Sequence, residues 1–485
     1  MDEDRGDALY ERFRFGNQFP VADEAALRAV MREAADALPM EQVMQLIPHV
    51  FNMVSSERCE DVVGGYLDRY VETRLAPFIE MVNAPHEGRG RVVFIASEIN
   101  YKIHREAKYL RRNGLRTYLI SLAPYDDSVR QAFESGFDAC LPLQMNLNLL
   151  QRLLDRLAPE VYHVHASMFA YALARTVIEH KGDAKVICEL NDITTVYAEP
   201  EVLAMVASEE DVELDYAMER YLCHHADGLI YQFSDAVQDE LRGRHGALPP
   251  AIQMQPYPCP EYIRYDSDKF SRQDGIVRCV FPGNTPTMGP NHPPEIFPSR
   301  GLYDAAVSFC SQGVGVDIVV DPSKSHDISD PGYAAWHELQ QRFGHFRIRP
   351  GVSPDRITEA IGRYDFGLIA MRIDWNVLRV RPSKLKLQTA NKFFAFLEAG
   401  LPIIVCAEME YMASLAEELG VGFAIPSDEF DQIAERIAAF DYDAAVENIR
   451  RYNERHNMGR EIHRLIDFYA ELGAIEHAEL SRRAV

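Results

Sequence analysis

The 485-residue chain lacks several features that would direct its interpretation elsewhere. Its eight cysteines lie far apart and form no CxxC pair, which argues against a zinc or redox centre and is consistent with a reducing cytoplasm. No apolar run reaches the roughly twenty residues that a membrane-spanning helix needs. The acidic start MDEDRGD does not resemble a secretory signal. We therefore expect a soluble, cytoplasmic protein.

Positive charge is also scarce. The chain has 50 Lys and Arg against 74 Asp and Glu, a formal net charge of −24, which argues against nucleic acid as a partner. Its 47% hydrophobic and 26% charged content is typical of a globular protein. Because the length exceeds that of one ordinary domain, we expect two or three packed domains.

Strand-like and helix-like segments alternate along most of the chain. Residues 1–90 form a helical extension with apolar positions at helical spacing, and its role in oligomerisation, acceptor docking or a partner contact stays open. Buried strand patterns then alternate with amphipathic helix patterns over 91–256 and again over 257–440. This alternation predicts an α/β fold with two doubly wound parallel-sheet domains. The Pro-rich passage from Gln255 predicts the linker between them, and 441–485 are expected to be helical.

The most informative stretch runs from Tyr364 to Val405. It reads YDFGLIAM, then a basic loop, then NKFFAFLEAGLPIIV, which predicts a strand, a helix ending at Gly400 and a second strand. Ligands bind outside the carboxyl ends of parallel strands, so the loop lies at the binding edge. The loop and the helix start carry Arg372, Arg379, Arg381, Lys384, Lys386 and Lys392. On an acidic chain these cations predict a phosphate site; a solvated, charged loop is the alternative.

The same stretch resembles the carboxyl-terminal domain of retaining, nucleotide-sugar-dependent glycosyltransferases of the GT-B fold, the family 4-like or "group 1" enzymes. Their pattern "yDvgLip…nKlfEYlaaGlPvv" is matched at Tyr364, Asp365, Gly367, Leu368, Ile369, Asn391, Lys392, Phe394, Leu397, Ala399, Gly400, Leu401 and Pro402. The resemblance spans from about Arg91 to the terminus. It implies two Rossmann-like domains facing a cleft, the first for the acceptor and the second for the donor, with terminal helices that cross back onto the first domain.

The resemblance also implies a set of donor-binding residues. The family has a Gly-Arg pair after the first strand of the second domain, where this chain has Gly283 and Asn284. Arg300, heading the next helix, resembles the family's Lys-Gly element, and with Lys384 and Lys392 it is expected to stabilise the departing diphosphate. Asn391 and Glu398 are expected to orient donor groups.

Glu398 enters this set because the family's ribose-binding glutamate falls at Ala395, which cannot make that hydrogen bond. Glu398 lies one helical turn further on and could substitute if the helix is rotated or shifted. The alternative is that Glu398 caps the helix or faces solvent.

Three residues of the first domain are candidates for catalysis. His165 lies in the segment EVYHVHAS, which resembles the family's "DvvHaH" strand end, and a histidine there faces the cleft and can bond a hydroxyl or titrate near neutrality. Asn191 stands where many relatives have a histidine; it can form hydrogen bonds but cannot act as an acid or base. Asp192 could act on the acceptor side, or in a core or capping role.

Metal and membrane contacts are also addressed by the sequence. No DxD motif occurs in a suitable loop, since the Asp441–Asp443 pair lies in the terminal helical region, so we expect no required metal and no cofactor besides the nucleotide-sugar co-substrate.

The first helix of the first domain and its end carry Lys102, Arg105, Lys108, Arg111, Arg112 and Arg116. Related enzymes with lipid-linked acceptors dock to anionic membrane through such a face; a solvated helix face is the alternative.

The sequence thus predicts a metal-independent, retaining glycosyltransferase of glycan biosynthesis. It moves a sugar from a nucleotide-activated donor to an unidentified glycan, lipid-linked or protein acceptor. A catalytically degenerate GT-B-like binding or scaffold protein is the alternative, because Asn284, Asn191 and Ala395 depart from the expected donor contacts. A GT-B epimerase or hydrolase is a third interpretation. A homo-oligomer and a peripheral contact with the inner face of the membrane stay open.

Overall fold

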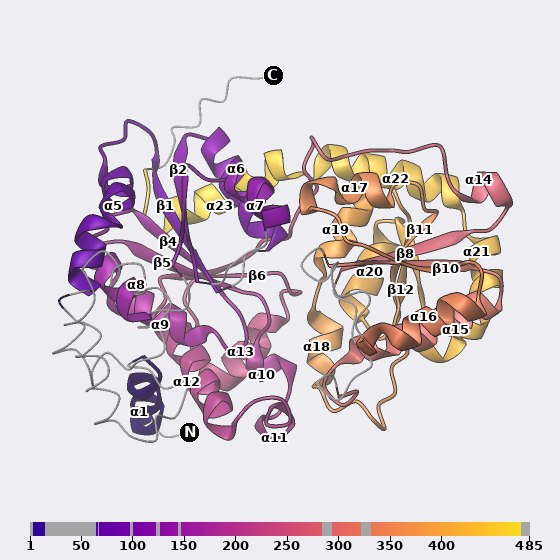
Figure 1. Ribbon diagram of the computed structural model, residues 1–485, viewed down its shortest axis with the longest axis horizontal. Coiled ribbons are helices and arrows are strands. Elements are labelled where there is room, and N and C mark those ends of the chain that lie inside the picture. The colour runs from indigo at the N-terminus through magenta and orange to yellow at the C-terminus, as the bar shows by residue number, and fades with distance from the viewer. Residues whose placement is uncertain are drawn as a thin grey trace.

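The computed structural model describes residues 3–14, 65, 67–97, 100–122, 127–143, 147–283, 293–321 and 331–476. Two parallel sheets stand side by side, each covered by helices (Figure 1). This arrangement confirms the predicted α/β fold with two doubly wound domains.

The first sheet has seven described strands, in the order β3-β2-β1-β4-β5-β6-β7, and every neighbouring pair is parallel. Its strands are β1 (Gly90–Ala96), β2 (Leu115–Ser121), β3 (Ala139–Pro142), β4 (Val161–Ala166), β5 (Lys185–Leu190), β6 (Gly228–Tyr231) and β7 (Ala251–Gln253). The strand order reverses between β1 and β4. Ligands of doubly wound sheets bind at such a reversal, beyond the carboxyl ends of the strands.

Both faces of this sheet are buried. In β1, Val92 and Phe94 belong to one apolar cluster while Val93 and Ile95 belong to another. A parallel sheet between two helical layers needs apolar side chains on both faces, which is why its strands read as continuous apolar runs. The covering helices are α5 (Ala76–Asn83), α6 (Tyr101–Arg112), α7 (Asp127–Glu134), α8 (Leu147–Leu154), α9 (Tyr171–Glu179), α10 (Thr194–Tyr197), α11 (Pro200–Leu203), α12 (Glu209–His225) and α13 (Val237–His245).

The second sheet has six described strands, in the order β10-β9-β8-β11-β12-β13, again all parallel. They are β8 (Arg278–Gly283), β9 (Gly315–Val320), β10 (Phe346–Arg349), β11 (Phe366–Ile369), β12 (Ile403–Cys406) and β13 (Gly422–Ile425). The order reverses between β8 and β11, so the end of β8 at Gly283 and the loop after β11 flank the second expected binding edge.

The helices of the second domain surround this sheet. They are α14 (Ser271–Asp274), α15 (Gly301–Ser311), α16 (Ala334–Arg342), α17 (Ile357–Ile361), α18 (Pro382–Leu387), α19 (Asn391–Glu398), α20 (Glu410–Glu418) and α21 (Ile433–Ala439), with short 3-10 turns η1 (Pro298–Arg300), η3 (Pro331–Tyr333), η4 (Pro354–Arg356) and η5 (Ser427–Gln432). The predicted strand, helix and strand between Tyr364 and Val405 are β11, α19 and β12.

Two glycines of this unit are required by packing. A Cβ at Gly367, in β11, would overlap the ring of Phe396 on α19, so the glycine lets the helix lie directly on the strand. Gly400 ends the helix with a φ of +66°, which favours glycine, and a Cβ there would clash with Tyr265. Both glycines therefore fix how α19 sits on the sheet.

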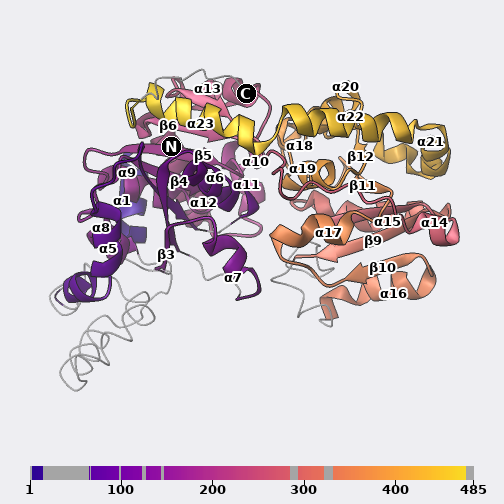
Figure 2. The same ribbon diagram turned by 90° about the horizontal axis from the view of Figure 1, so that it is seen from above.

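The last two helices join the domains a second time. Helix α22 (Tyr442–Arg455) packs on the second domain, where Asn453 donates a hydrogen bond of 2.7 Å to the carbonyl of Leu397. Helix α23 (Met458–Glu471) then lies over the first domain (Figure 2) and packs against α6. The chain therefore passes between the domains both before β8 and between α22 and α23.

The described part of the N-terminal extension packs on the first domain. Helix α1 (Glu3–Arg14) lies against α12, with an Arg5–Glu213 ion pair of 2.5 Å and an Asp7–Arg175 ion pair of 2.6 Å. The helices expected over 25–38 and 43–54 lie outside the described residues. No helix within the described ranges has the length and apolar character needed to cross a bilayer.

We expect Gly367→Ala to destabilise the fold by about 1–3 kcal/mol, because the added methyl group must displace the buried Phe396 ring. Gly344→Ala is the matched control, since a Cβ at that position meets nothing within 4 Å. Urea denaturation of the two variants measures the difference. Equal midpoints for the two variants would contradict the packing argument.

Candidate active site

A cavity of about 170 Å³ lies where the carboxyl edges of the two sheets meet. The first domain contributes the residues after β5 and β6, and the second contributes the segment between α18 and the start of α19. The lining residues are Asn191, Asp192, Gln232, Phe233, Gln388, Thr389 and Asn391. The structure therefore brings together three of the predicted site residues, Asn191, Asp192 and Asn391, from domains that are far apart in sequence.

Asn391 is the first residue of α19. No side chain caps this helix start, and the first N–H groups of a helix have no partner within the helix. The Oδ1 atom of Asn391 is buried and has no hydrogen-bond partner among the described residues. The start of α19 thus offers unsatisfied polar groups beside the cavity.

Lys392 follows on the same helix start. Its Nζ lies 3.5 Å from the centroid of the Phe281 ring. A Cβ built on Gly283, at the end of β8, would lie 3.8 Å from this Nζ, so the glycine borders the ammonium group. Lys392 forms no ion pair within the described ranges, and burial lowers its pKa to about 7. Gly283 and Lys392 are therefore adjacent, as a shared donor site requires.

Arg300 lies at the N-terminus of α15, the helix before β9, as expected. The following residue, Gly301, accepts a hydrogen bond of 2.9 Å from the backbone N–H of Arg372, and a Cβ at Gly301 would overlap the Arg372 carbonyl. The start of α15 is thus held close to the segment after β11. Asn284 lies outside the described residues, and the contact of Arg300 with a phosphate stays a prediction.

Lys384 is bound to the opposite domain. Its ammonium forms an ion pair with the carboxylate of Asp192 and lies 4.6 Å from the centroid of the Tyr197 ring. The capping interpretation of Asp192 is wrong, because the N-cap of α10 is Ile193 and no side chain caps that helix. A donor phosphate would have to compete with Asp192 for Lys384.

The remaining cations of the basic loop divide into two groups. Arg381 pairs with Glu199 of the first domain at 2.5 Å, and Lys386 pairs with Glu410 at 2.7 Å. Arg372 and Arg379 are exposed. Arg372 and Arg379 therefore fit the interpretation of a solvated, charged loop. Lys392, by contrast, is partly buried and has no acidic partner within the described residues.

Glu398 occupies the opposite end of α19 and does not line the cavity. Its buried carboxylate forms two hydrogen bonds with the guanidinium of Arg105 on α6, the longer of which is 3.0 Å. It also accepts a hydrogen bond of 2.6 Å from the backbone N–H of Cys259. The alternative that Glu398 faces solvent is therefore wrong. The described contacts of this side chain join α19 to α6 and to the segment at Cys259, and a contact with the donor stays a prediction.

Helix α6 presents only part of the basic face that the membrane-docking interpretation requires. Lys102 and Arg105 are fully buried. Lys108 and Arg112 both bind Glu261, in the segment that leads into the second domain, at 2.6 and 3.1 Å. The solvated-face alternative is therefore wrong for Lys102 and Arg105. Arg111 and Arg112 are exposed, and a membrane contact stays a prediction.

His165 ends β4 but is buried. Its Nε2 lies 2.8 Å from the Nδ2 atom of Asn100, the residue that caps α6. Burial lowers the pKa of His165 to about 4. The expectation that it titrates near neutrality is therefore wrong, because the imidazole is neutral at pH 7. A hydrogen bond from this side chain to a sugar hydroxyl stays a prediction.

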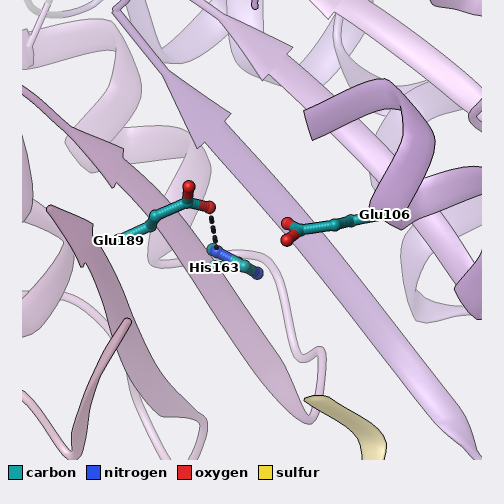
Figure 3. Close-up of side chains that lie close together, drawn as sticks. All are labelled: Glu106, His163 and Glu189. Carbon is teal, nitrogen blue, oxygen red and sulfur yellow. Dashed lines mark hydrogen bonds and ion pairs between the residues drawn. The ribbon is translucent and has the colours of Figure 1, made fainter. Parts of the chain in front are cut away.

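Behind the cavity lies a buried charge cluster centred on Glu189. Figure 3 shows Glu106, His163 and Glu189 converging on the same space. His163 contacts Glu189 through Nε2 at 3.2 Å and Tyr469 of α23 through Nδ1 at 2.7 Å. Burial raises the pKa of Glu106 to about 8. Although burial opposes it, Lys102 and His163 hold the pKa of Glu189 well below its usual value.

The cluster has the spacing of a metal site, because its three ligand atoms lie within 4.8 Å of one another. The Nζ of Lys102, however, lies 2.6 Å from Glu189 and 3.3 Å from Glu106. An ammonium group therefore already supplies the cation that the two carboxylates need, and a metal ion would have to displace it. These residues do not fit a resident metal.

Two facing, doubly wound parallel-sheet domains with a C-terminal helix that returns to the first domain define the GT-B fold, and this chain has that fold. A family model described as "Glucosyltransferase 3-like, C-terminal domain" matches residues 332–467. This region includes Lys384, Asn391, Lys392 and Glu398. The glycosyltransferase resemblance seen in the sequence is therefore confirmed over residues 332–467. No curated protein matches the chain.

Solved structures share the architecture at low sequence identity. The N-terminal domain of trehalose-6-phosphate phosphatase from Candida albicans is 11% identical, with a TM-score of 0.51 over 79% of this chain and 97% of that one. A mutant of the Thermobaculum terrenum O-GlcNAc transferase is 12% identical, with a TM-score of 0.46 over 93% and 84%. The S. aureus MnaA–UDP structure is 11% identical, with a TM-score of 0.48 over 79% and 97%.

Four cavity residues were not predicted from the sequence. Gln232 and Phe233 directly follow β6, and their position at the carboxyl end of a buried strand was a usable signal. Gln388 and Thr389 lie between α18 and α19; Thr389 donates a hydrogen bond of 2.6 Å to the Gln232 carbonyl. This interdomain contact had no local sequence signature.

The interdomain role of Glu398 predicts that Glu398→Gln destabilises the protein by about 3–5 kcal/mol, because it leaves the Arg105 guanidinium buried without a counter-charge. Replacing both partners, in Arg105→Met with Glu398→Met, should recover much of this loss. Urea denaturation of the single and double variants measures both effects. If Glu398→Gln instead kept wild-type stability and weakened nucleotide-sugar binding, Glu398 would be a donor ligand.

Proposed function

We propose that this protein is a glycosyltransferase that uses a nucleoside-diphosphate sugar as donor. The observation that carries the proposal is Lys392, a partly buried ammonium without an acidic partner among the described residues, at the start of α19 and beside Gly283. Burying a cation is unfavourable unless an anion compensates it. A diphosphate at this edge of the second sheet would provide that anion.

The second domain would hold the leaving group. The ammonium of Lys392 and the N-terminus of α19, which no side chain caps, would stabilise negative charge there. Lys384 can join them if the diphosphate replaces Asp192 as its partner, and Arg300 heads the neighbouring helix α15. These positive groups take the part that a metal ion plays in other transferases, so we propose that transfer is metal-independent.

The first domain would hold the sugar and the acceptor. Asn191 lines the cavity from the first domain and Asn391 lines it from the second, and both side chains can bond sugar hydroxyls. His165 is neutral and forms a hydrogen bond with Asn100, so its proposed role is to position the end of β4 and the start of α6. The acceptor would be a glycan, a lipid-linked sugar or a protein.

The reaction would proceed with retention of configuration. The bond between the anomeric carbon and the diphosphate oxygen breaks, and the acceptor oxygen bonds to the same face of that carbon. The acceptor proton passes to the departing diphosphate oxygen. This route needs no strong general base, which agrees with a cavity whose one described carboxylate, Asp192, is already paired with Lys384.

A second candidate function is a GT-B-like protein that binds a ligand or partner without catalysis. The ion pairs Asp192–Lys384 and Arg381–Glu199 favour it, because they occupy two cleft cations in the absence of a donor. Asn191, in the place of a histidine, favours it as well.

Calorimetric titration of the purified protein with UDP, GDP and CMP tests the proposal. One of the three nucleotides should bind, because the described part of the cleft offers an unpaired cation. Binding should be followed by sugar transfer from the matching nucleotide-sugar. A folded protein that binds none of them contradicts donor binding and favours the second candidate, whereas free nucleotide released from donor without any acceptor indicates hydrolysis or epimerisation.

We expect Lys392→Ala to weaken binding of that nucleotide about tenfold to a hundredfold, because it removes a charge-assisted contact to the diphosphate. The melting temperature should remain nearly unchanged, since Lys392 forms no ion pair with the described residues. Lys386→Ala is the matched control on the same basic segment, because its ammonium pairs with Glu410. Equal affinities for both variants would remove Lys392 from the site.

The pKa of Lys392, about 7 in the ligand-free protein, predicts a pH dependence of donor binding. A bound diphosphate favours the ammonium form and raises this pKa, so binding takes up a proton above pH 7. Affinity should therefore fall as pH rises from 7, by up to about tenfold per unit until the pKa of the bound form is reached. Lys392→Arg keeps its charge and should lose this slope; a slope shared with wild type would assign it to another group.

A further inference from the structure

A second cavity lies within the first domain and shares no lining residue with the cleft cavity. It has a volume of about 440 Å³ and is formed by α1, α9, α10, α12 and α13. Helix α1 forms one wall, where Gly6 allows a close approach to Ala217 of α12. The N-terminal extension therefore completes this cavity.

The lining of this cavity is basic, although the chain as a whole is strongly acidic. It includes the side chains of Arg175, Arg220, Arg244, His224, His225 and His245, whereas Asp7 is the one carboxylate among its described lining residues. A concentration of cationic and N–H donor groups against a net charge of −24 favours an anionic ligand. Its volume lies in the range of sites for small molecules.

Several of these cations already have partners. Arg175 binds Asp7 at 2.6 Å and Glu179 at 2.8 Å, and Arg244 binds Glu240 at 3.0 Å. His245 contacts the buried carboxylate of Glu219 at 2.8 Å, and that carboxylate also accepts a hydrogen bond of 3.0 Å from the N–H of Thr195. The acidic groups named here therefore already have partners.

Arg220 and His225 differ from the others. Both are exposed on α12, and neither forms an ion pair with the described residues. The His225 ring lies against the ring of Tyr221, with centroids 4.3 Å apart, and the Arg175 guanidinium lies 4.4 Å from the centroid of the same Tyr221 ring. The cavity thus has among its lining residues a guanidinium that can bind an anion and an aromatic side chain, the combination that suits a phosphate on a small organic body.

We propose that this cavity binds a small organic phosphate monoester, with Arg220 and His225 contacting the phosphate group. Tyr221 contacts the organic part. Asp7 competes with the ligand for Arg175, since both are anions that this guanidinium can bind.

The test is calorimetric titration of the full chain with glucose 6-phosphate, with glucose as the uncharged probe. Wild type should bind the phosphate ester with a dissociation constant below about 1 mM and should not bind glucose. Arg220→Ala should weaken binding at least fivefold. Asp7→Asn should tighten it, because it removes one of the two carboxylates paired with Arg175 and leaves Glu179 as its described ion-pair partner. Arg272→Ala, which removes an exposed arginine of α14 with no ion pair in the described residues, should leave binding unchanged.

Lys392→Ala separates this cavity from the cleft. Binding that survives Lys392→Ala and is lost in Arg220→Ala supports the proposal. Binding lost in Lys392→Ala but kept in Arg220→Ala overturns it, as do equal binding of glucose and an absence of binding. Nucleotide titration of Arg220→Ala should give the wild-type affinity, so a failure of this proposal is distinguishable from a failure of the proposed function.

Discussion

The ion pair between Arg105 and Glu398 is the contact on which the arrangement of the two domains depends. Both side chains are fully buried, so each charge is tolerable only with the other in place. The Arg105 guanidinium also lies 3.5 Å from the centroid of the Tyr101 ring. Because Glu398 ends α19 and Asn391 begins it, the contact that fixes one end of this helix also aims its other end at the cleft cavity.

Lys384 and Arg381 form ion pairs between the domains, and these ion pairs compete with the proposed binding of a diphosphate. Asp192 holds Lys384 and Glu199 holds Arg381, and each pair joins the first domain to the second. On the proposed function, a diphosphate in the cleft would offer Lys384 a stronger counter-charge than one carboxylate and would exchange an interdomain contact for a ligand contact. Lys392 has no such partner within the described residues, and burial lowers its pKa to about 7. A bound anion would therefore raise the pKa of Lys392.

The sequence predicted the features that are local and periodic. Buried strand runs located most strands of both sheets, and the motif from Tyr364 to Val405 located α19 with its start at the cleft. It did not predict the burial of Lys102 and Arg105, because charged residues at helical spacing indicate a solvent-facing surface. The partner of Arg105 lies 293 residues away, so no local pattern could pair them. The ion pair of Asp192 with Lys384 was missed for the same reason.

The buried cluster around Glu189 leaves the first-domain wall of the cleft with little net charge, whereas the second-domain wall is cationic. Lys102 neutralises Glu189, Glu106 has a raised pKa, and His165 is neutral, so the wall of the first domain carries little net charge despite its many ionisable groups. Gln232 connects this cluster to the cavity through a 3.5 Å contact with Glu189. A hydrogen-bonding wall on one side faces a cationic helix start on the other. That asymmetry matches a substrate that is a neutral sugar at one end and a diphosphate at the other.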